Sequence, residues 1–235
     1  KKKNNNDINN LKHLLDSDTF KTVVFPEENI VLAAFNEFDG QGLWHFSGGA
    51  VAYDTDLTNT AALKQFLDIN TNPVDTGIIL WHLYQKMGIG FLDHLRGPFG
   101  FALWDNEKKS LIVATDPYGI RPVVYHQKNG DYIAASRIRT LFIDKSLPRE
   151  IHPDAVYHYL FYQAICSPLT IYRDVKKLEP GKGHWVIGST FNEFTHYDIS
   201  YTPGVSKTET EWKKEIFDNV LQAVKNFLPL SPYEK

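Results

Sequence analysis

The alternation of apolar runs and polar turns is clearest in the middle of the chain. Phe99–Asp105 and Ser110–Thr115 are apolar runs joined by four polar residues, which predicts a β-hairpin. Val123–His126 and Tyr132–Ala135 flank Asn129-Gly130, a pair that tolerates the positive φ angles of a tight turn. Within these runs apolar side chains fall on both faces of the strand, so both faces of the sheet need cover. We therefore predict a sheet that lies between a second sheet and a layer of helices.

The same patterns place further elements on either side of this region. Strands are expected at Lys21–Phe25, Ile30–Phe35 and Leu43–Tyr53, with a turn at Pro26–Asn29 between the first two. Helices are expected at Ile8–Leu15, Ala61–Leu67, Asp75–Met87 and Asp154–Ala164. Gly88 is expected to end the third of these helices. Gly48-Gly49 is interpreted as a glycine bulge and not as a nucleotide-binding loop, because Ala50–Tyr53 continue as strand instead of opening a helix.

The composition changes after Pro203-Gly204, which is interpreted as a linker. Thr208-Glu209-Thr210-Glu211 has the spacing of a capping box and predicts the start of a helix that ends before Pro229. Its large apolar residues form a stripe made of Trp212, Ile216, Val220 and Val224, adjoined by Phe217, Leu221 and Leu228. Because such a helix is stabilised mainly by burying its stripe, we predict that it packs against material outside this chain. The predicted division is 1–202 and 203–235.

Charge and composition exclude several classes of function. The chain has 25 Lys and Arg against 28 Asp and Glu, a net charge of −3, which gives no electrostatic case for a nucleic-acid or acidic membrane partner. No apolar run approaches the roughly 20 residues that cross a bilayer. The nine histidines are scattered without the clustering of metal ligands, so no metal site is predicted. A single cysteine builds no intrachain disulfide, and we therefore expect a reducing, cytoplasmic location.

Three ordered blocks of sequence carry a resemblance to a known family. They are Gly97 to Asp105, Asp116 to Tyr125 and Ile133-Ala134-Ala135-Ser136. They resemble the amino-terminal amidotransferase domain of the asparagine synthetase family, the class II glutamine amidotransferases. The resemblance is good from about Asp75 to Gly183. It implies an α+β fold, the four-layer αββα sandwich of antiparallel sheets found in amino-terminal-nucleophile hydrolases, and it makes the helix after Thr208 the first helix of a synthetase domain.

The resemblance does not carry a complete glutaminase site onto this chain. The family uses a cysteine at the very amino terminus, whose free α-amine is the base, so the internal Cys166 is interpreted as a small buried hydrophobe and not as a nucleophile. Asp54-Thr55 stands where the family has the Asn-Gly pair of its oxyanion hole. An ionised aspartate only accepts hydrogen bonds, so Asp54 and Thr55 are expected to form a polar loop. Asp75 matches the aspartate that reads the amino group of glutamine, but a helix cap alone is the preferred interpretation.

Asp75, Asp54 and Thr55 are therefore the candidates for a degenerate glutamine pocket, and no catalytic residue is assigned. The first hypothesis is a non-hydrolysing domain of an amide-forming ligase, whose synthetase domain, in the same polypeptide or a partner subunit, would bind ATP and Mg. The second is a working glutaminase whose cysteine precedes Lys1. The third is a scaffold or binding module without chemistry, and a homodimer is compatible with all three. An upstream Met-Cys-Gly would favour the second, and a downstream Ser-Gly-Gly-x-Asp-Ser the first.

Overall fold

The computed structural model describes residues 20–25, 30–35, 40–70, 74–201, 204 and 206–227. The chain divides into two compact units, Lys1–Asp198 and Ile199–Lys235, and each is described by itself. The predicted assignment of 1–202 and 203–235 to two domains stays a prediction. The helix expected at Ile8–Leu15 and the turn expected at Pro26–Asn29 lie outside the described residues. In the described part of the chain, no helix is both long and apolar enough to cross a bilayer.

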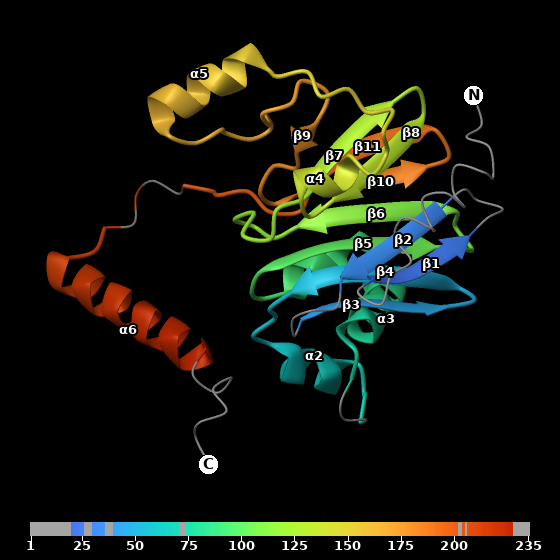
Figure 1. Ribbon diagram of the computed structural model, residues 1–235. Helices are drawn as coiled ribbons and strands as arrows, with labels where there is room; N and C mark the ends of the chain where they lie inside the picture. Colours follow the sequence, from blue (N-terminus) through green and yellow to red (C-terminus); the bar gives the residue numbers. More distant parts are fainter. Residues whose placement is uncertain are drawn as a thin grey trace. The chain divides into compact units, whose positions relative to one another are not determined.

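The first unit is built on three antiparallel sheets (Figure 1). The largest contains β3 (Gln41–Phe46), β4 (Gly49–Thr55), β5 (Phe99–Asp105), β6 (Ser110–Thr115), β10 (Lys182–Ile187) and β11 (Thr190–Thr195). Its strands lie in the order β11-β10-β6-β5-β4-β3. A three-stranded sheet in the order β8-β7-β9 contains β7 (Val124–Lys128), β8 (Asp131–Ala135) and β9 (Lys176–Lys177). The third is a hairpin of β1 (Phe20–Phe25) and β2 (Ile30–Phe35).

Both hairpins predicted for the middle of the chain are present. β5 pairs with β6 in a register that sets Leu103 opposite Ile112, and β7 pairs with β8. In the second hairpin Asn129 and Gly130 both adopt positive φ angles, 56° and 86°, as a tight turn requires. All strand pairs among the described residues are antiparallel, so the predicted α+β class is confirmed.

Helices cover one face of the six-stranded sheet. They are α2 (Thr60–Phe66), α3 (Thr76–Met87) and the 3₁₀ helix η2 (Gly88–His94), and α3 ends at Gly88 as predicted. Ile79 and Leu83 of α3 are fully buried in one cluster with Leu103 and Ile112 of the sheet. Burying each such side chain stabilises the fold by about 1.5–3 kcal/mol, and this burial keeps α3 packed on the sheet.

The opposite face of the six-stranded sheet is covered by the two smaller sheets. Leu32 of β2 packs with Leu43 and Trp104, and Tyr125 of β7 packs with Val113. The side chains of each central strand therefore alternate between a face toward the helices and a face between the sheets. Both faces are apolar, as the sequence pattern predicted.

The outer side of the three-stranded sheet carries the last layer. The short helix α4 (Ile138–Leu141) packs its buried Leu141 against Val124 and Leu147. The layers therefore follow in the predicted order of helix, sheet, sheet and helix. A further helix, α5 (Pro153–Tyr162), begins where the His152 ring accepts a hydrogen bond from the Asp154 N–H at 3.3 Å.

The single strand expected over Leu43–Tyr53 is wrong. Ser47 and Gly48 form a turn between two separate strands, β3 and β4. A Cβ at Gly49 would lie 2.4 Å from the Trp104 carbonyl oxygen and 2.6 Å from the Trp81 ring. The glycines therefore allow a tight turn and a close approach between layers, and they form neither a bulge nor a nucleotide-binding loop.

The second unit consists mainly of α6 (Glu209–Phe227). Its predicted capping box is present, because the Thr208 N–H and hydroxyl both donate to Glu211 Oε2 at 2.7 Å, and the Glu211 N–H is 3.3 Å from Thr208 Oγ1. Its large apolar side chains are exposed: Trp212, Ile216, Phe217, Val220, Leu221 and Val224. What covers this stripe stays a prediction.

Candidate functional site

Asp54 lies near the end of β4, on the face between the sheets. Gln41 is directly opposite in the β3–β4 register, and its Nε2 donates to Asp54 Oδ2 at 3.3 Å. Asp54 Oδ1 lies 3.4 Å from Arg121 Nε. This second contact is an ion pair without hydrogen-bond geometry between two buried atoms. Both carboxylate oxygens of Asp54 therefore face donors that belong to the protein itself.

Arg121 is held in place by a loop built around a buried carboxylate. Asp116, which is 1% exposed, accepts hydrogen bonds from the N–H groups of Tyr118, Ile120 and Arg121 at 2.9, 3.1 and 2.9 Å. Thr115 Oγ1 also donates to the Arg121 carbonyl at 2.7 Å. Since so many backbone groups are satisfied by one side chain, the loop 116–122 has a fixed shape that presents the guanidinium to Asp54.

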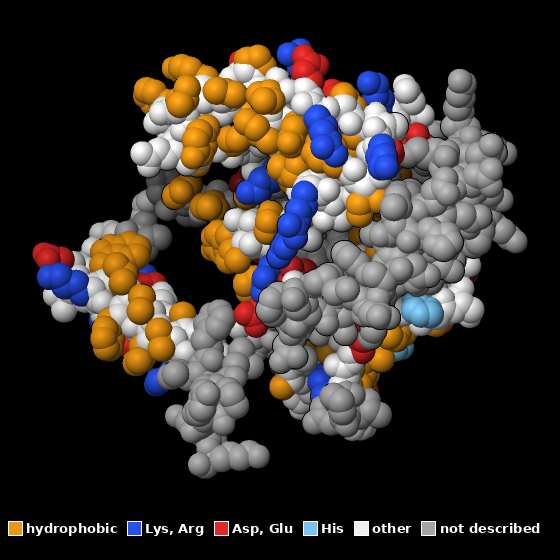
Figure 2. Space-filling model, in the orientation of Figure 1, with side chains coloured by type: hydrophobic (Ala, Val, Ile, Leu, Met, Phe, Trp, Pro, Cys, Tyr) orange, Lys and Arg blue, Asp and Glu red, His pale blue; other side chains and the backbone are white. Residues whose placement is uncertain are grey.

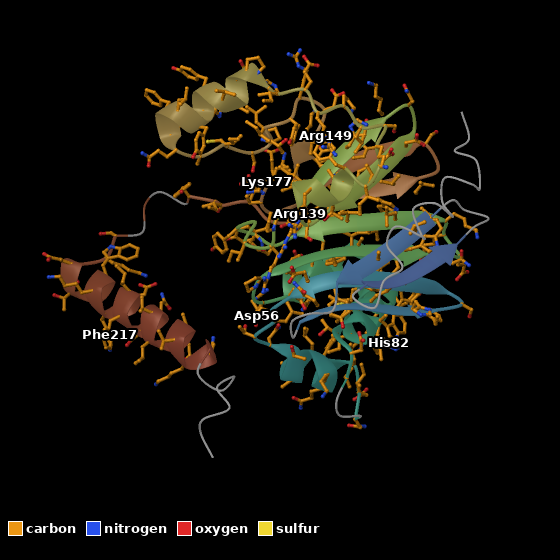
Figure 3. All side chains as sticks on the ribbon, viewed as in Figure 1. Asp56, His82, Arg139, Arg149, Lys177 and Phe217 are labelled. Atoms are coloured by element: carbon orange, nitrogen blue, oxygen red, sulfur yellow. The ribbon has the colours of Figure 1, made fainter. Side chains whose placement is uncertain are left out.

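Thr55, the next residue of β4, points to the opposite face. It is 3% exposed, and its hydroxyl donates to the Gly40 carbonyl at 3.3 Å. The expectation that Asp54 and Thr55 form a polar loop is therefore wrong, because they are the last two residues of strand β4. Asp56, which follows directly, is labelled in Figure 3 close to the strand's end.

Asp75 caps α3, as the sequence suggested. Its Oδ1 accepts hydrogen bonds from the Gly77 N–H at 2.7 Å and from the Tyr53 hydroxyl at 2.9 Å. Burial, together with the negative charge of Asp75, raises the pKa of Tyr53 well above its usual value, so this hydroxyl keeps its proton and donates. The Asp75 carboxylate is thus fixed at the positive end of a helix dipole.

The structure does not gather the three predicted residues into one pocket. Asp54 lies between the sheets, whereas Thr55 and the Tyr53–Asp75 pair lie on the helix side of β4. The sequence analysis also missed Gln41 as a partner of Asp54. Centring a two-residue turn on Ser47 and Gly48 would have set Gln41 opposite Asp54, so the signal was present once the turn was recognised.

This arrangement is unsuited to stabilising an oxyanion. An oxyanion hole needs hydrogen-bond donors that point at the developing negative charge. Asp54 offers only acceptors when ionised, and its nearest donors, Gln41 and Arg121, are already directed to its own carboxylate. A negative side chain at this point repels a second negative charge.

Cys166 is exposed, so its interpretation as a small buried hydrophobe is wrong. It lies in the segment after α5, where its carbonyl accepts from the Leu169 N–H at 3.0 Å. Among the described residues, no donor or acceptor contacts its thiol. An exposed thiol without a neighbouring base has no activating partner in the described part of the chain.

Comparison with known proteins identifies the family. Residues 43–197, more than half of the chain, match the family described as a glutamine amidotransferase domain. The chain belongs to the glutamine amidotransferase domain family. The sequence of this amidotransferase domain is 30% identical over 188 residues to asparagine synthetase [glutamine-hydrolyzing] 1 of Bacillus subtilis, a match that covers 80% of this chain and 29% of that protein. The predicted resemblance to asparagine synthetases is thus confirmed.

Other similarities are more distant. The putative asparagine synthetase [glutamine-hydrolyzing] 2 of Methanocaldococcus jannaschii is 25% identical over 192 residues, which covers 78% of this chain and 37% of that protein. Among solved structures, the glutamine phosphoribosylpyrophosphate amidotransferase of B. subtilis is 19% identical with a TM-score of 0.46 and covers 67% of this chain and 31% of that chain. The chain spans about a third of the length of these relatives.

Proposed function

We propose that this amidotransferase domain is the non-hydrolysing front part of an asparagine-synthetase-like ligase that forms amide bonds with ATP. The observation that carries the proposal is the state of Asp54, whose carboxylate is bound by Gln41 and Arg121 at the position that aligns with the family's oxyanion-hole asparagine. Losing one oxyanion-hole donor reduces the rate by about 10²–10³. Replacing that donor with a negative charge is still less favourable.

The relatives and the second unit support the ligase part of the proposal. The relatives are named as asparagine synthetases, and the chain aligns with about a third of their length. The apolar stripe of α6 is exposed on a helix that ought to bury it, which fits a helix at the start of a further domain. ATP and Mg would be bound by that domain and not by the residues described here.

The test is the release of glutamate from L-glutamine by the purified chain. Asparagine synthetase 1 of B. subtilis, whose name includes glutamine hydrolysis, serves as the positive control. We expect no release above the rate in buffer, both for the chain and for its Cys166→Ser variant. Release that disappears in Cys166→Ser would instead make the exposed thiol a nucleophile and overturn the proposal.

A working glutaminase is the second candidate, and one observation favours it. Tyr53 and Gly77 hold the Asp75 carboxylate, and Asp75 aligns with the aspartate that binds the amino group of glutamine in the family. This candidate requires a cysteine upstream of Lys1. The same assay on the polypeptide made from the whole gene separates the two, because only this candidate predicts glutamate release there.

A further inference from the structure

Helix α5 exposes nearly all of its large apolar side chains. Between 37% and 77% of each of these side chains is accessible: Ile151 just before the helix, and Val156, Tyr157, Tyr159, Leu160, Phe161 and Tyr162 within it. Ala155 is the buried residue of the helix, and Asp154 is its charged one. We call these seven exposed residues the α5 surface.

The α5 surface extends around the helix instead of forming one stripe. Tyr159, Leu160, Phe161 and Tyr162 are consecutive, so at 100° per residue they point in every direction around the axis. A ten-residue helix is marginally stable in water by itself, and α5 is apolar on every side except that of Asp154 and His158, so most of its surface needs cover. A partner that covers α5 must therefore enclose it in a groove, because a flat surface would leave half of it in water.

The loop 116–122 continues the α5 surface toward the candidate site. Tyr118 and Ile120 are 66% and 58% exposed, although the backbone of their loop is fixed by Asp116. Figure 2 shows hydrophobic side chains gathered over α5 and, below it on the same side of the first unit, over the loop between β6 and β7. Arg121, the partner of Asp54, belongs to this loop. A protein seated on α5 would thus reach the edge of the Asp54 site.

Basic side chains border this apolar surface. Between residues 137 and 177 there are seven Lys and Arg but four Asp and Glu, in a chain whose net charge is −3. In the view of Figure 3, Arg149, Lys177 and Arg139 are labelled one below the other between α5 and the loop that joins β6 to β7. None of these three has a carboxylate within ion-pair distance among the described residues, and Arg149 lies over the Phe142 ring instead. An acidic rim on the partner would complement them.

We propose that α5 inserts into an apolar groove with an acidic rim on the folded polypeptide that, in the longer relatives, lies outside the part matched here. This inference rests on the proposed function, in which that polypeptide is the ligase. The match covers 29–37% of the asparagine synthetase relatives, so a large protein surface is present in them. Aromatic enrichment with few charges on the helix is typical of the centre of a protein interface.

Two other occupants fit the surface less well. A second copy docked symmetrically on α5 would set the same basic residues against each other, which is repulsive. A membrane-surface helix carries Lys and Arg on its polar face, whereas α5 contains no Lys or Arg residue and its polar residues are Asp154 and His158.

The experiment measures how fast a thiol on α5 reacts with a maleimide. Leu160→Cys and the control Ile187→Cys, at an exposed residue on the β10–β11 hairpin, are each made in a Cys166→Ser background. Each variant is prepared as the chain 1–235 and as the complete polypeptide of the gene. We expect Leu160→Cys to react at least about 10-fold more slowly in the complete polypeptide, and Ile187→Cys to react equally in both. Adding Arg139→Glu and Lys177→Glu should restore fast reaction at Leu160→Cys.

Several results would overturn the proposal. Equal rates for Leu160→Cys in both polypeptides would show that nothing covers α5. Slow reaction already in the chain 1–235, with sedimentation as a dimer, would show that a second copy covers it. Protection of that chain by anionic lipid vesicles would show that a membrane does. A gene that encodes no further folded polypeptide would overturn it as well. If Leu160→Cys is protected but the complete polypeptide forms no amide with ATP, the docking stands and the proposed function fails. If amide forms while Leu160→Cys stays unprotected, the proposed function stands and the docking fails.

Discussion

The buried imidazole of His184 should make the stability of this domain depend on pH. His184 lies on β10 between the two sheets and is 0% exposed. The rings of Tyr125 and Phe191 lie 4.4 Å from it, and Tyr132 contacts its Nδ1 at 2.9 Å. Its Nε2 is 3.7 Å from Glu193 Oε2, so the ring proton belongs on Nε2 and the Tyr132 hydroxyl donates to Nδ1.

Burial lowers the pKa of His184 from 6.5 to about 4, although the nearby Glu193 opposes this shift. Between these two values the unfolded chain binds a proton that the folded chain does not, so stability falls as the pH falls. The whole shift corresponds to about 3 kcal/mol, at about 1.4 kcal/mol for each pH unit. The contribution of His184 to stability is complete above about pH 6.5, and about 2 kcal/mol of it is lost when the pH reaches 5.

Other groups that titrate must be separated from His184. Burial also lowers the pKa of His196, so His196 adds a loss in the same direction. The hydrogen bond from Lys182 lowers the pKa of Glu193. The contribution of this carboxylate to stability is therefore lost only at more acidic pH. Comparing the chain with His184→Gln at each pH removes both contributions, because both remain in the variant.

The assay is urea unfolding followed by tryptophan fluorescence, at about pH 7 and about pH 5. We expect the free energy of unfolding to fall by about 2 kcal/mol more in the unmodified chain than in His184→Gln. His45→Gln, a change at an exposed histidine, should leave the fall unaltered. Equal falls in the unmodified chain and in His184→Gln would refute the reasoning, whatever the absolute stability of the variant.

Two further predictions concern packing and a buried hydrogen bond. Gly49→Ala should lower the free energy of unfolding by about 1–3 kcal/mol, because its Cβ would meet the Trp104 carbonyl at 2.4 Å. The control Gly90→Ala should change this free energy little, because no atom lies within 4 Å of its Cβ. Equal urea midpoints for these two variants would contradict the close approach. Tyr84→Phe removes the 2.9 Å hydrogen bond from Tyr84 to the 2% exposed Asp105 and should lower it by about 1.5–3 kcal/mol. A loss below about 0.5 kcal/mol in urea unfolding would show that the bond is unimportant.

The layered fold could be predicted because its signals are local. The β5–β6 hairpin follows from two apolar runs around a polar turn, and the β7–β8 hairpin follows from Asn129-Gly130. The apolar character of both strand faces required cover on both sides, which fixed the order of layers. The capping box at Thr208 likewise depends on residues a few positions apart.

The errors lie where a distant neighbour decides the outcome. The sequence around Gly49 predicts a bulge, but a glycine is needed there because the Trp81 ring, from another layer, leaves no room for a Cβ. Cys166 is small and apolar, yet nothing in its own segment reveals that the surrounding loop stays on the surface. The pairing of Asp54 with Arg121 joins strand β4 to the loop 116–122, which comes much later in the chain, so no spacing in the sequence indicates it.

The alternation of β4 places neighbouring residues under separate constraints. Asp54 contacts polar groups between the sheets, whereas Thr55 and Tyr53 belong to the helix side. A change at Asp54 therefore acts on Arg121 and Gln41 between the sheets, whereas a change at Thr55 acts on its contact with Gly40 on the helix side. Neighbouring residues of β4 therefore contact different parts of the fold. Under the proposed function, a substitution at the position of Asp54 could remove hydrolysis while the core on the other face of β4 kept its packing.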